Sequence, residues 1–144
     1  MIATASCGDR TGLVATAWNS LSADPPTLLA CINKSASAHD MIGRSRAFSV
    51  NLLPAIDCET VAIFSAKRGL SGRDRFVAAD WVDGPLGQPL FARAVVAFEC
   101  ALEDRHDYAT HSILIGTVGD MRMQANAPLL YVNGAYACAE AIPQ

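Results

Sequence analysis

Residues 20–37 read SLSADPPTLLACINKSAS and combine a turn, a strand and a polar loop. The turn is expected at the DPP sequence of residues 24–26, because proline has no backbone N–H and fits neither a helix interior nor a strand ladder. Residues 27–32 are apolar on both faces, which predicts a strand buried on both sides. The polar residues 33–37 then end it. We therefore expect a buried strand with a polar segment at each end.

Further strands are expected where short runs rich in Val, Leu, Ile and Thr lie between turn residues. A turn is predicted at residues 8–12, where two glycines flank polar side chains. Together with the buried strand, the predicted strands are residues 2–7, 13–19, 27–32, 47–53, 95–103, 111–123 and 129–132. About seven strands in so short a chain favour closure, because closure removes exposed sheet edges. The expected fold class is mainly β, a β-barrel with peripheral helices.

Two short helices are expected beside the strands. Ser37 followed by Asp40 resembles a capping box, which predicts a helix over residues 38–45. Asp57 is expected to cap a second helix that ends near Lys67. Val61 and Phe64 would share one face of that helix, so we expect it to pack on the sheet.

Length and composition exclude several classes of protein. The 144 residues fit one domain, 1–144, and 51% hydrophobic with 17% charged residues excludes a disordered chain. A net charge of -3 without a polybasic stretch argues against nucleic acid or an anionic membrane as a partner. No apolar run reaches the roughly 20 residues of a membrane span. Five cysteines without a CxxC motif, and the lack of a secretory signal, predict reduced thiols in the cytoplasm.

Common catalytic and metal motifs are missing from the sequence. The three histidines and five cysteines match no structural zinc spacing, so no metal is expected. There is no GxSxG, GxGxxG or GxxxxGK[ST] motif, which argues against a nucleophile elbow, a Rossmann site and a P-loop. A Ser, His and Asp hydrolase stays open, because the convergence of such residues cannot be seen in one sequence.

Two polar clusters flank the buried strand, residues 16–22 before it and residues 33–37 after it. Their small side chains expose backbone N–H groups, their hydroxyls donate hydrogen bonds, and Lys34 adds a positive charge. The N-terminus of the helix over residues 38–45 would add its dipole, so the clusters suit a phosphate group. A turn and a helix cap require the same residue types, and spacing alone leaves both interpretations open.

The chain resembles the flavin reductase domain family of FMN-binding split barrels. The segments that carry the resemblance occur in family order: residues 20–37, 48–53 (FSVNLL), 74–76 (DRF), 84–90, 99–100 (EC) and 110–116 (THSILIG). They span nearly the whole chain, and the pattern is most similar to the short NADH-dependent reductases, including the pyrimidine-degradation type. Members of this family supply reduced flavin to monooxygenases.

The resemblance implies a cofactor and a site. FMN would be bound, with FAD as an alternative, and NADH or NADPH would donate the hydride. Flavin contacts would come, from ring to phosphate, from Thr16, Ala17, Trp18, Ser20, Ser22, Asn33, Lys34 and Ser37. His111 would be the catalytic residue beside the entering nicotinamide. A homodimer is also implied, with reduced flavin diffusing to a partner flavin-dependent monooxygenase.

Several positions keep other interpretations open. The family usually opens with a helix and a complete first strand that this chain lacks, so the resemblance implies an N-terminal truncation. Thr16-Ala17 stands where members often carry a polar pair, and Ala109-Thr110 stands where Gly-Asp precedes the histidine. A non-catalytic flavin-binding module of the same fold is therefore the alternative hypothesis. Trp18 is expected either in the core or against flavin. The cationic side chains expected either at the surface or at pyridine-nucleotide phosphates are Lys67, Arg73 and Arg75.

Overall fold

The computed structural model describes residues 1–77 and 80–140. Its strands are β1 (Ile2–Ser6), β2 (Asp9–Leu13), β3 (Trp18–Ala23), β4 (Pro26–Asn33), β5 (Ala47–Leu52), β6 (Trp81–Asp83), β7 (Pro89–Phe91), β8 (Val96–Tyr108), β9 (His111–Met123), β10 (Leu129–Val132) and β11 (Ala135–Cys138). Its helices are α1 (Ser37–Ser45), α2 (Cys58–Phe64) and the 3-10 helix η1 (Gly72–Phe76). The last four residues of the predicted domain 1–144, residues 141–144, lie outside the described residues.

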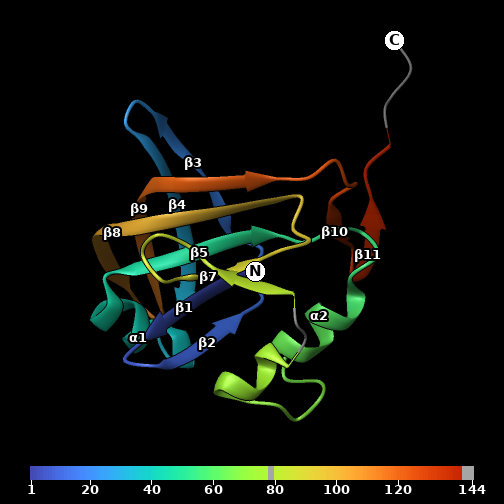
Figure 1. The fold of residues 1–144 in the computed structure, drawn as a ribbon, viewed down its shortest axis with the longest axis horizontal. Coiled ribbons are helices and arrows are strands. Elements are labelled where there is room, and N and C mark those ends of the chain that lie inside the picture. The colour runs from blue at the N-terminus through green and yellow to red at the C-terminus, as the bar shows by residue number, and fades with distance from the viewer. Residues whose placement is uncertain (78–79, 141–144) are drawn as a thin grey trace.

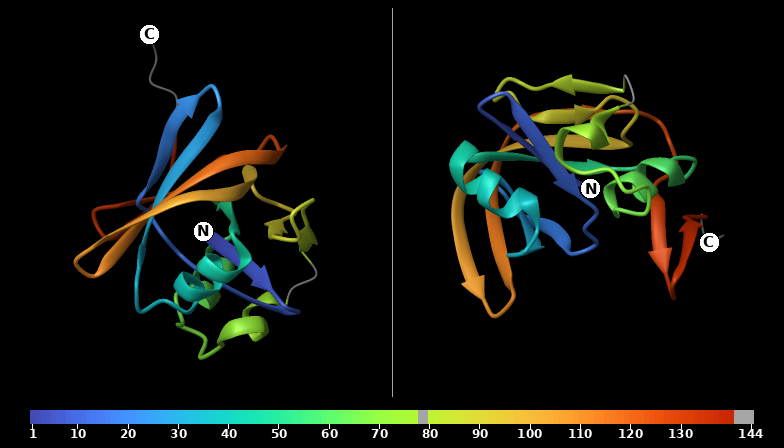
Figure 2. Two further views of the ribbon diagram at one scale, coloured as in Figure 1. Left: turned by 90° about the vertical axis from the view of Figure 1, so that its left-hand side faces the viewer. Right: turned by 90° about the horizontal axis from the view of Figure 1, so that it is seen from below.

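Seven strands form one antiparallel sheet in the order β2-β1-β5-β8-β9-β4-β3. Its two edge strands, β2 and β3, are consecutive in the chain and are joined by residues 14–17. Figure 1 shows the helices α1 and α2 beneath this sheet, and Figure 2 shows how strongly the sheet twists from one edge to the other. The prediction of a mainly β fold with peripheral helices is confirmed.

Two apolar clusters hold the fold together. The larger one lies inside the curled sheet, where Phe48, Ile32 and Leu114 are almost fully buried and Ile42 of α1 packs against them. The second lies under α2, where Phe64 meets Phe76 edge to face with ring centroids 5.1 Å apart. Apolar burial of this kind is the main driving force of folding. Both helices therefore serve as covers for the sheet.

The prediction of a strand over residues 13–19 is wrong, and so is the turn over residues 8–12. Residues 14–17 link two strands, and the turn before β2 is confined to Cys7 and Gly8, whose φ values are 52° and 82°. Gly12 lies inside β2 because a Cβ there would stand 2.8 Å from the carbonyl oxygen of Ile2. This glycine is required by close packing, which the pattern of turn residues in the sequence does not reveal.

The positions of both predicted helices are confirmed, but their ends differ from the prediction. Ala36 is the N-cap of α1, and the Ser37 hydroxyl bonds the Thr11 hydroxyl at 2.7 Å instead of capping the helix. Asp57 is the N-cap residue of α2, and its carboxylate accepts the Thr60 hydroxyl. This helix ends at Phe64, three residues before the predicted end. The predicted strand set lacks β2, β3, β6, β7 and β11.

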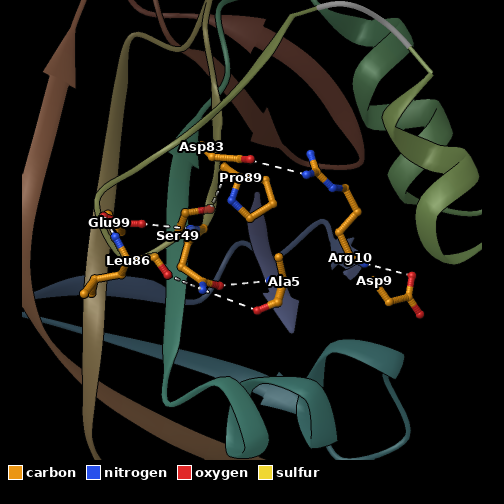
Figure 3. Close-up of polar contacts among 9 residues, drawn as sticks. Ala5, Asp9, Arg10, Ser49, Asp83, Leu86, Pro89 and Glu99 are labelled. Carbon is orange, nitrogen blue, oxygen red and sulfur yellow. Dashed lines mark hydrogen bonds and ion pairs between the residues drawn. The ribbon is translucent and has the colours of Figure 1, made fainter. Parts of the chain in front are cut away.

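Glu99 of β8 is fully buried and organises the loop between β6 and β7 (Figure 3). Its carboxyl oxygens accept the backbone N–H groups of Leu86 and Gln88, each at 2.9 Å. A Cβ on Gly84 would stand 2.5 Å from this carboxyl group, so only glycine fits there. The Gln88 side chain continues the network to Thr4 and Ala5 of β1. Every contact made by Glu99 therefore ties one part of the scaffold to another.

Candidate functional site

The end of β4, the start of α1 and the turn between β8 and β9 meet on one side of the sheet (Figure 2). Asn33 is paired with His111 across the two strands, and the backbone N–H of Lys34 donates to the carbonyl oxygen of Thr110 at 2.9 Å. Residues far apart in sequence therefore form one polar cluster. We call it the Lys34 cluster and define it as residues 33–37, 39, 105, 107 and 110–112.

The loop into α1 presents donors to solvent. Asn33 Oδ1 accepts both the backbone N–H and the hydroxyl of Ser35, at 2.9 and 2.8 Å, which fixes a tight turn. The backbone N–H groups of Ser37 and Ala38, the first residues of α1, have no acceptor within the described residues. Free N–H groups at a helix N-terminus attract anions, and Lys34 adds a full positive charge beside them.

Asp107 stands next to this cationic loop. Its Oδ2 lies 3.6 Å from Lys34 Nζ, and its Oδ1 lies 3.5 Å from Arg105 Nε and accepts the Ser112 hydroxyl at 2.6 Å. The Ser112 hydrogen bond and the positive charges of Lys34, Arg105 and His39 hold the pKa of Asp107 below its usual range. The carboxylate is therefore ionised at neutral pH and partly neutralises the loop.

An open pocket of about 720 Å³ lies beside the link between β2 and β3, and Val14, Ala15 and Thr16 of this link line it. Trp18 of β3 and Lys67, which follows the end of α2, line it as well. The lining is mostly apolar and includes Leu53, Val61, Pro128, Leu129 and Tyr131. Pockets of this size and character bind small organic molecules.

The link between β2 and β3 connects this pocket to the Lys34 cluster. The backbone N–H of Cys31 donates to the carbonyl oxygen of Ala17 at 2.8 Å. Cys31 precedes Asn33 on β4 by two residues, a distance of roughly 7 Å along a strand. The link therefore joins the lining of the pocket to the strand that ends in the Lys34 cluster.

Comparison with known proteins assigns the family. The model of the flavin reductase like domain matches residues 1–140. The chain belongs to this flavin reductase family. It is 36% identical over 137 residues to the FMN reductase (NADH) RutF of Agrobacterium fabrum. This alignment covers 94% of this chain and 78% of the relative.

Solved structures of flavin reductases share the fold. A protein from Haemophilus somnus that is assigned as a flavin reductase superposes with a TM-score of 0.90 and 32% identity over 96% of this chain and 88% of its own. The NADH:FAD oxidoreductase SgcE6 of Streptomyces globisporus, in complex with NAD and FAD fragments, superposes with a TM-score of 0.84 and 28% identity. The superposition covers 94% of this chain and 81% of SgcE6.

Four of the predicted site residues come together in this flavin reductase, and three more lie nearby. Asn33, Lys34, Ser37 and His111 belong to the Lys34 cluster. Thr16 and Trp18 line the pocket, and Ala17 between them is bonded to β4 at Cys31. Trp18 also packs against Phe98, with ring centroids 6.3 Å apart. Both interpretations of Trp18, core packing and a position beside the ligand pocket, therefore fit the geometry.

Ser20 and Ser22 lie elsewhere. Ser22 is paired with Thr27, six residues before Asn33 on β4, which is roughly 20 Å along the strand. Its hydroxyl donates to the carbonyl oxygen of Asp24 inside the turn. Ser20 is paired with Leu28 and is likewise distant from Lys34. The β3–β4 hairpin runs away from the cluster, so the geometry does not bring these hydroxyls to a phosphate at Lys34.

The three remaining candidate cations lie in different places: one at the pocket, one at the surface and one in the scaffold. Lys67 lines the pocket, whereas Arg73 is exposed. Arg75 donates to the carbonyl oxygens of Leu70 and Gly12, at 3.0 and 2.8 Å, and so fastens η1 to β2. Only Lys67 of the three is placed where a ligand would meet it.

Ser112, His39 and Asp40 have the connectivity of a hydrolase triad but not its accessibility. His39 Nε2 lies 2.9 Å from Ser112 Oγ, and His39 Nδ1 lies 3.0 Å from Asp40 Oδ1. Ser112 is fully buried, and its proton is donated to Asp107. No substrate can reach this hydroxyl, so the arrangement does not support a hydrolase.

Sequence reasoning missed Asp107, Ser112 and His39 as members of the cluster. His39 and Ser112 are 73 positions apart in the chain, so no local spacing signals their contact. The alternation of strand residues gave a partial signal, because Ser112 must face the opposite side of β9 from His111. Within residues 1–77 and 80–140 no group of three or more His, Cys, Asp or Glu side chains is arranged to hold a metal ion. In the same residues no helix has the length and apolar character needed to cross a membrane.

Proposed function

We propose that this protein is an NADH-dependent flavin reductase that reduces FMN. The observation that carries the proposal is that the β2–β3 link lines the apolar pocket and is also bonded to β4 at Cys31, two residues before Asn33 of the Lys34 cluster. The FMN reductase (NADH) of Agrobacterium fabrum, which is 36% identical, supports the choice of FMN and NADH. NADPH in place of NADH, and FAD in place of FMN, are the variants that the test below also examines.

The residues present fit a flavin mononucleotide. Lys34 and the free N–H groups of Ser37 and Ala38 would bind the phosphate, because they combine a charge with helix-terminal donors. The ribityl chain would follow the backbone of Thr16 and Ala17. The ring would lie against Trp18 in the mouth of the pocket. When bound, the flavin would supply the two-electron chemistry between the nicotinamide and the acceptor.

The protein's own contribution would be orientation. Residues 16–18 are held to β4 by the Ala17–Cys31 hydrogen bond, so they form a firm wall for a planar ring. His111 is exposed beside the loop, and its Nδ1 lies 2.8 Å from the Thr110 hydroxyl, which fixes the orientation of the imidazole ring. We assign His111 the role of orienting the nicotinamide over the flavin. Proton transfer by His111 is not required by this role.

A homodimer is part of the proposal. Apolar side chains are exposed on β3, on the β8–β9 hairpin and on the β10–β11 hairpin, among them Leu21, Ile113, Met121, Met123 and Tyr131. Exposed apolar surface of this extent is typical of an interface. We also propose that residues 1–144 act as one domain in the cytoplasm and that reduced flavin diffuses to a monooxygenase. A relative named flavin-dependent monooxygenase, reductase subunit HsaB, from Rhodococcus jostii, supports the last point.

The test is NADH oxidation by the purified protein with and without added FMN, together with its visible absorption spectrum. Turnover that requires FMN is expected, and parallel assays with FAD and NADPH rank the substrates. A yellow protein without turnover would instead favour the non-catalytic flavin-binding module. A protein that neither binds flavin nor oxidises NADH would contradict both.

A further inference from the structure

Lys34, the residue assigned to the flavin phosphate, already has a negatively charged neighbour. Asp107 Oδ2 lies 3.6 Å from Lys34 Nζ, and both side chains are partly open to solvent, with exposed fractions of 46% and 36%. An incoming phosphate would have to share the ammonium group with this carboxylate. In a site built only for tight binding of an anion, a second anion at this position is unfavourable.

The carboxylate has further partners besides Lys34. Its Oδ1 accepts the Ser112 hydroxyl at 2.6 Å, and Ser112 is in turn bound by the buried His39 at 2.9 Å. Arg105 Nε lies 3.5 Å from the same oxygen. These contacts also keep the pKa of Asp107 below its usual range, so the charge persists at neutral pH. The buried residues Ser112 and His39 thus support a half-exposed negative charge beside the proposed phosphate site.

The backbone of Lys34 is tied to the hairpin that carries Asp107. Its N–H is bound to Thr110 in the turn that follows Asp107, so the loop is joined to the β8–β9 hairpin. The fold therefore sets how closely the backbones on the two sides of this ion pair approach. Two flexible surface side chains that met by chance would lack this support.

We propose that Asp107 competes with the flavin phosphate for Lys34 and thereby keeps flavin binding weak enough for release. This inference rests on the proposed function, because a reductase that passes reduced flavin on must let it leave in each cycle. Asp107 is a positioning residue in this scheme: it acts through Lys34 and contacts no reacting atom. Ser112 and His39 hold it at the distance from Lys34 that the competition requires.

The decisive variant is Asp107→Asn, which removes the charge and keeps an oxygen that can accept the Ser112 hydroxyl. We expect FMN to bind roughly tenfold more tightly and to dissociate correspondingly more slowly, as measured by flavin fluorescence titration and stopped flow. Riboflavin, which lacks the phosphate, should bind the variant and the wild type equally. Asp107→Ser repeats the test with a smaller side chain if the Asn variant does not fold.

Two controls separate a specific effect from a change in overall charge. Asp104→Asn on the same strand makes the same charge change at an exposed carboxylate that faces His106 at 2.9 Å, and it should leave FMN binding unchanged. In a Lys34→Ala background, Asp107→Asn should have little effect, because the charge on which Asp107 acts is gone.

The outcomes distinguish this inference from the proposed function. Wild-type protein that binds FMN, together with an Asp107→Asn variant whose FMN affinity is unchanged or weaker, would overturn the inference alone. Equal tightening of riboflavin and FMN would overturn it too, because the effect would not depend on the phosphate. Wild-type protein that binds no flavin would overturn the proposed function and this inference with it.

Discussion

Glu99 and Asp107 lie on the same strand, β8, and their carboxyl groups have opposite surroundings. Glu99 is fully buried, and both of its oxygens accept backbone N–H groups of one loop (Figure 3). Asp107 is half exposed and faces Lys34 and Arg105. A carboxyl group satisfied by backbone stabilises a fold, whereas one that faces side-chain cations can exchange them for another anion. The comparison predicts that substitutions of Glu99 change the stability of the fold, whereas substitutions of Asp107 change flavin binding.

Glu99→Gln is expected to have the largest effect. The amide can accept only one of the two N–H groups that Leu86 and Gln88 donate, and it leaves the other unpaired in a buried site. We expect a loss of about 2 to 3 kcal/mol in the free energy of unfolding, measured by urea denaturation. Asp107→Asn is the matched control and should unfold close to the wild type. A stable Glu99→Gln protein would show that the two carboxyl groups are not as different as their surroundings indicate.

Lys34→Ala tests the surroundings of Asp107, where binding rather than stability is expected to change. Removing the ammonium group deletes the charge that would hold the phosphate, so FMN should bind roughly 10- to 100-fold more weakly. Riboflavin affinity and the urea midpoint should not change, and fluorescence titration with both flavins measures this. Arg73→Ala, at an exposed position outside the pocket lining, serves as a control for the loss of a positive charge. Equal weakening of both flavins would contradict the assignment of Lys34 to the phosphate.

His111→Ala is expected to separate reduction from binding. Without the imidazole the nicotinamide should be held less precisely, and the rate of flavin reduction by NADH should fall about tenfold in single-turnover absorbance measurements. The affinity for FMN should fall less, because the proposed phosphate contacts come from Lys34 and α1. His106→Ala, an exposed histidine of the same hairpin, is the control. If binding and reduction fell by the same factor, this division of roles would be wrong.

The smallest effect is expected for Cys100, whose thiol is buried on β8 next to Glu99. Burial first, and the charge of Glu99 second, raise the pKa of its thiol from the ordinary value of a cysteine to about 12. The unfolded chain therefore loses this proton at lower pH than the folded protein, so stability falls as the pH rises above about 9. By pH 10 this effect lowers the free energy of unfolding by about 1.4 kcal/mol. Cys100→Ala should show a shallower decline in urea unfolding between pH 8 and pH 10, and an identical decline would contradict the assignment.

Most of the scaffold could be predicted from local patterns. The apolar run at residues 27–32, the proline turn before it and the polar loop after it correspond to β4 and its two ends. The predicted strand at residues 111–123 coincides with β9, and that at 129–132 coincides with β10. The prediction failed at residues 13–19, where the end of β2, a link and the start of β3 follow one another. No periodic pattern of apolar residues marks these boundaries.

The candidate site was predictable only in part. Lys34, Asn33 and Ser37 are consecutive enough for their residue types to suggest a phosphate loop, and the family resemblance added His111. Composition and motif order also placed the chain in its class, because they depend on residues that are close in sequence. The sequence by itself thus determined six of the eleven strands, the polar loop and the family.

The tertiary structure alone decided which charges meet. Asp107 and Lys34 are brought together by the pairing of β4 with β9 and of β9 with β8, and His39 reaches Ser112 across 73 positions. The same pairing carries Ser20 and Ser22 to the far end of β4. Strand register fixes these distances, and register depends on long-range backbone hydrogen bonds and core packing that no local stretch of sequence contains. For this reason the internal competitor of the phosphate site became visible only in the folded chain.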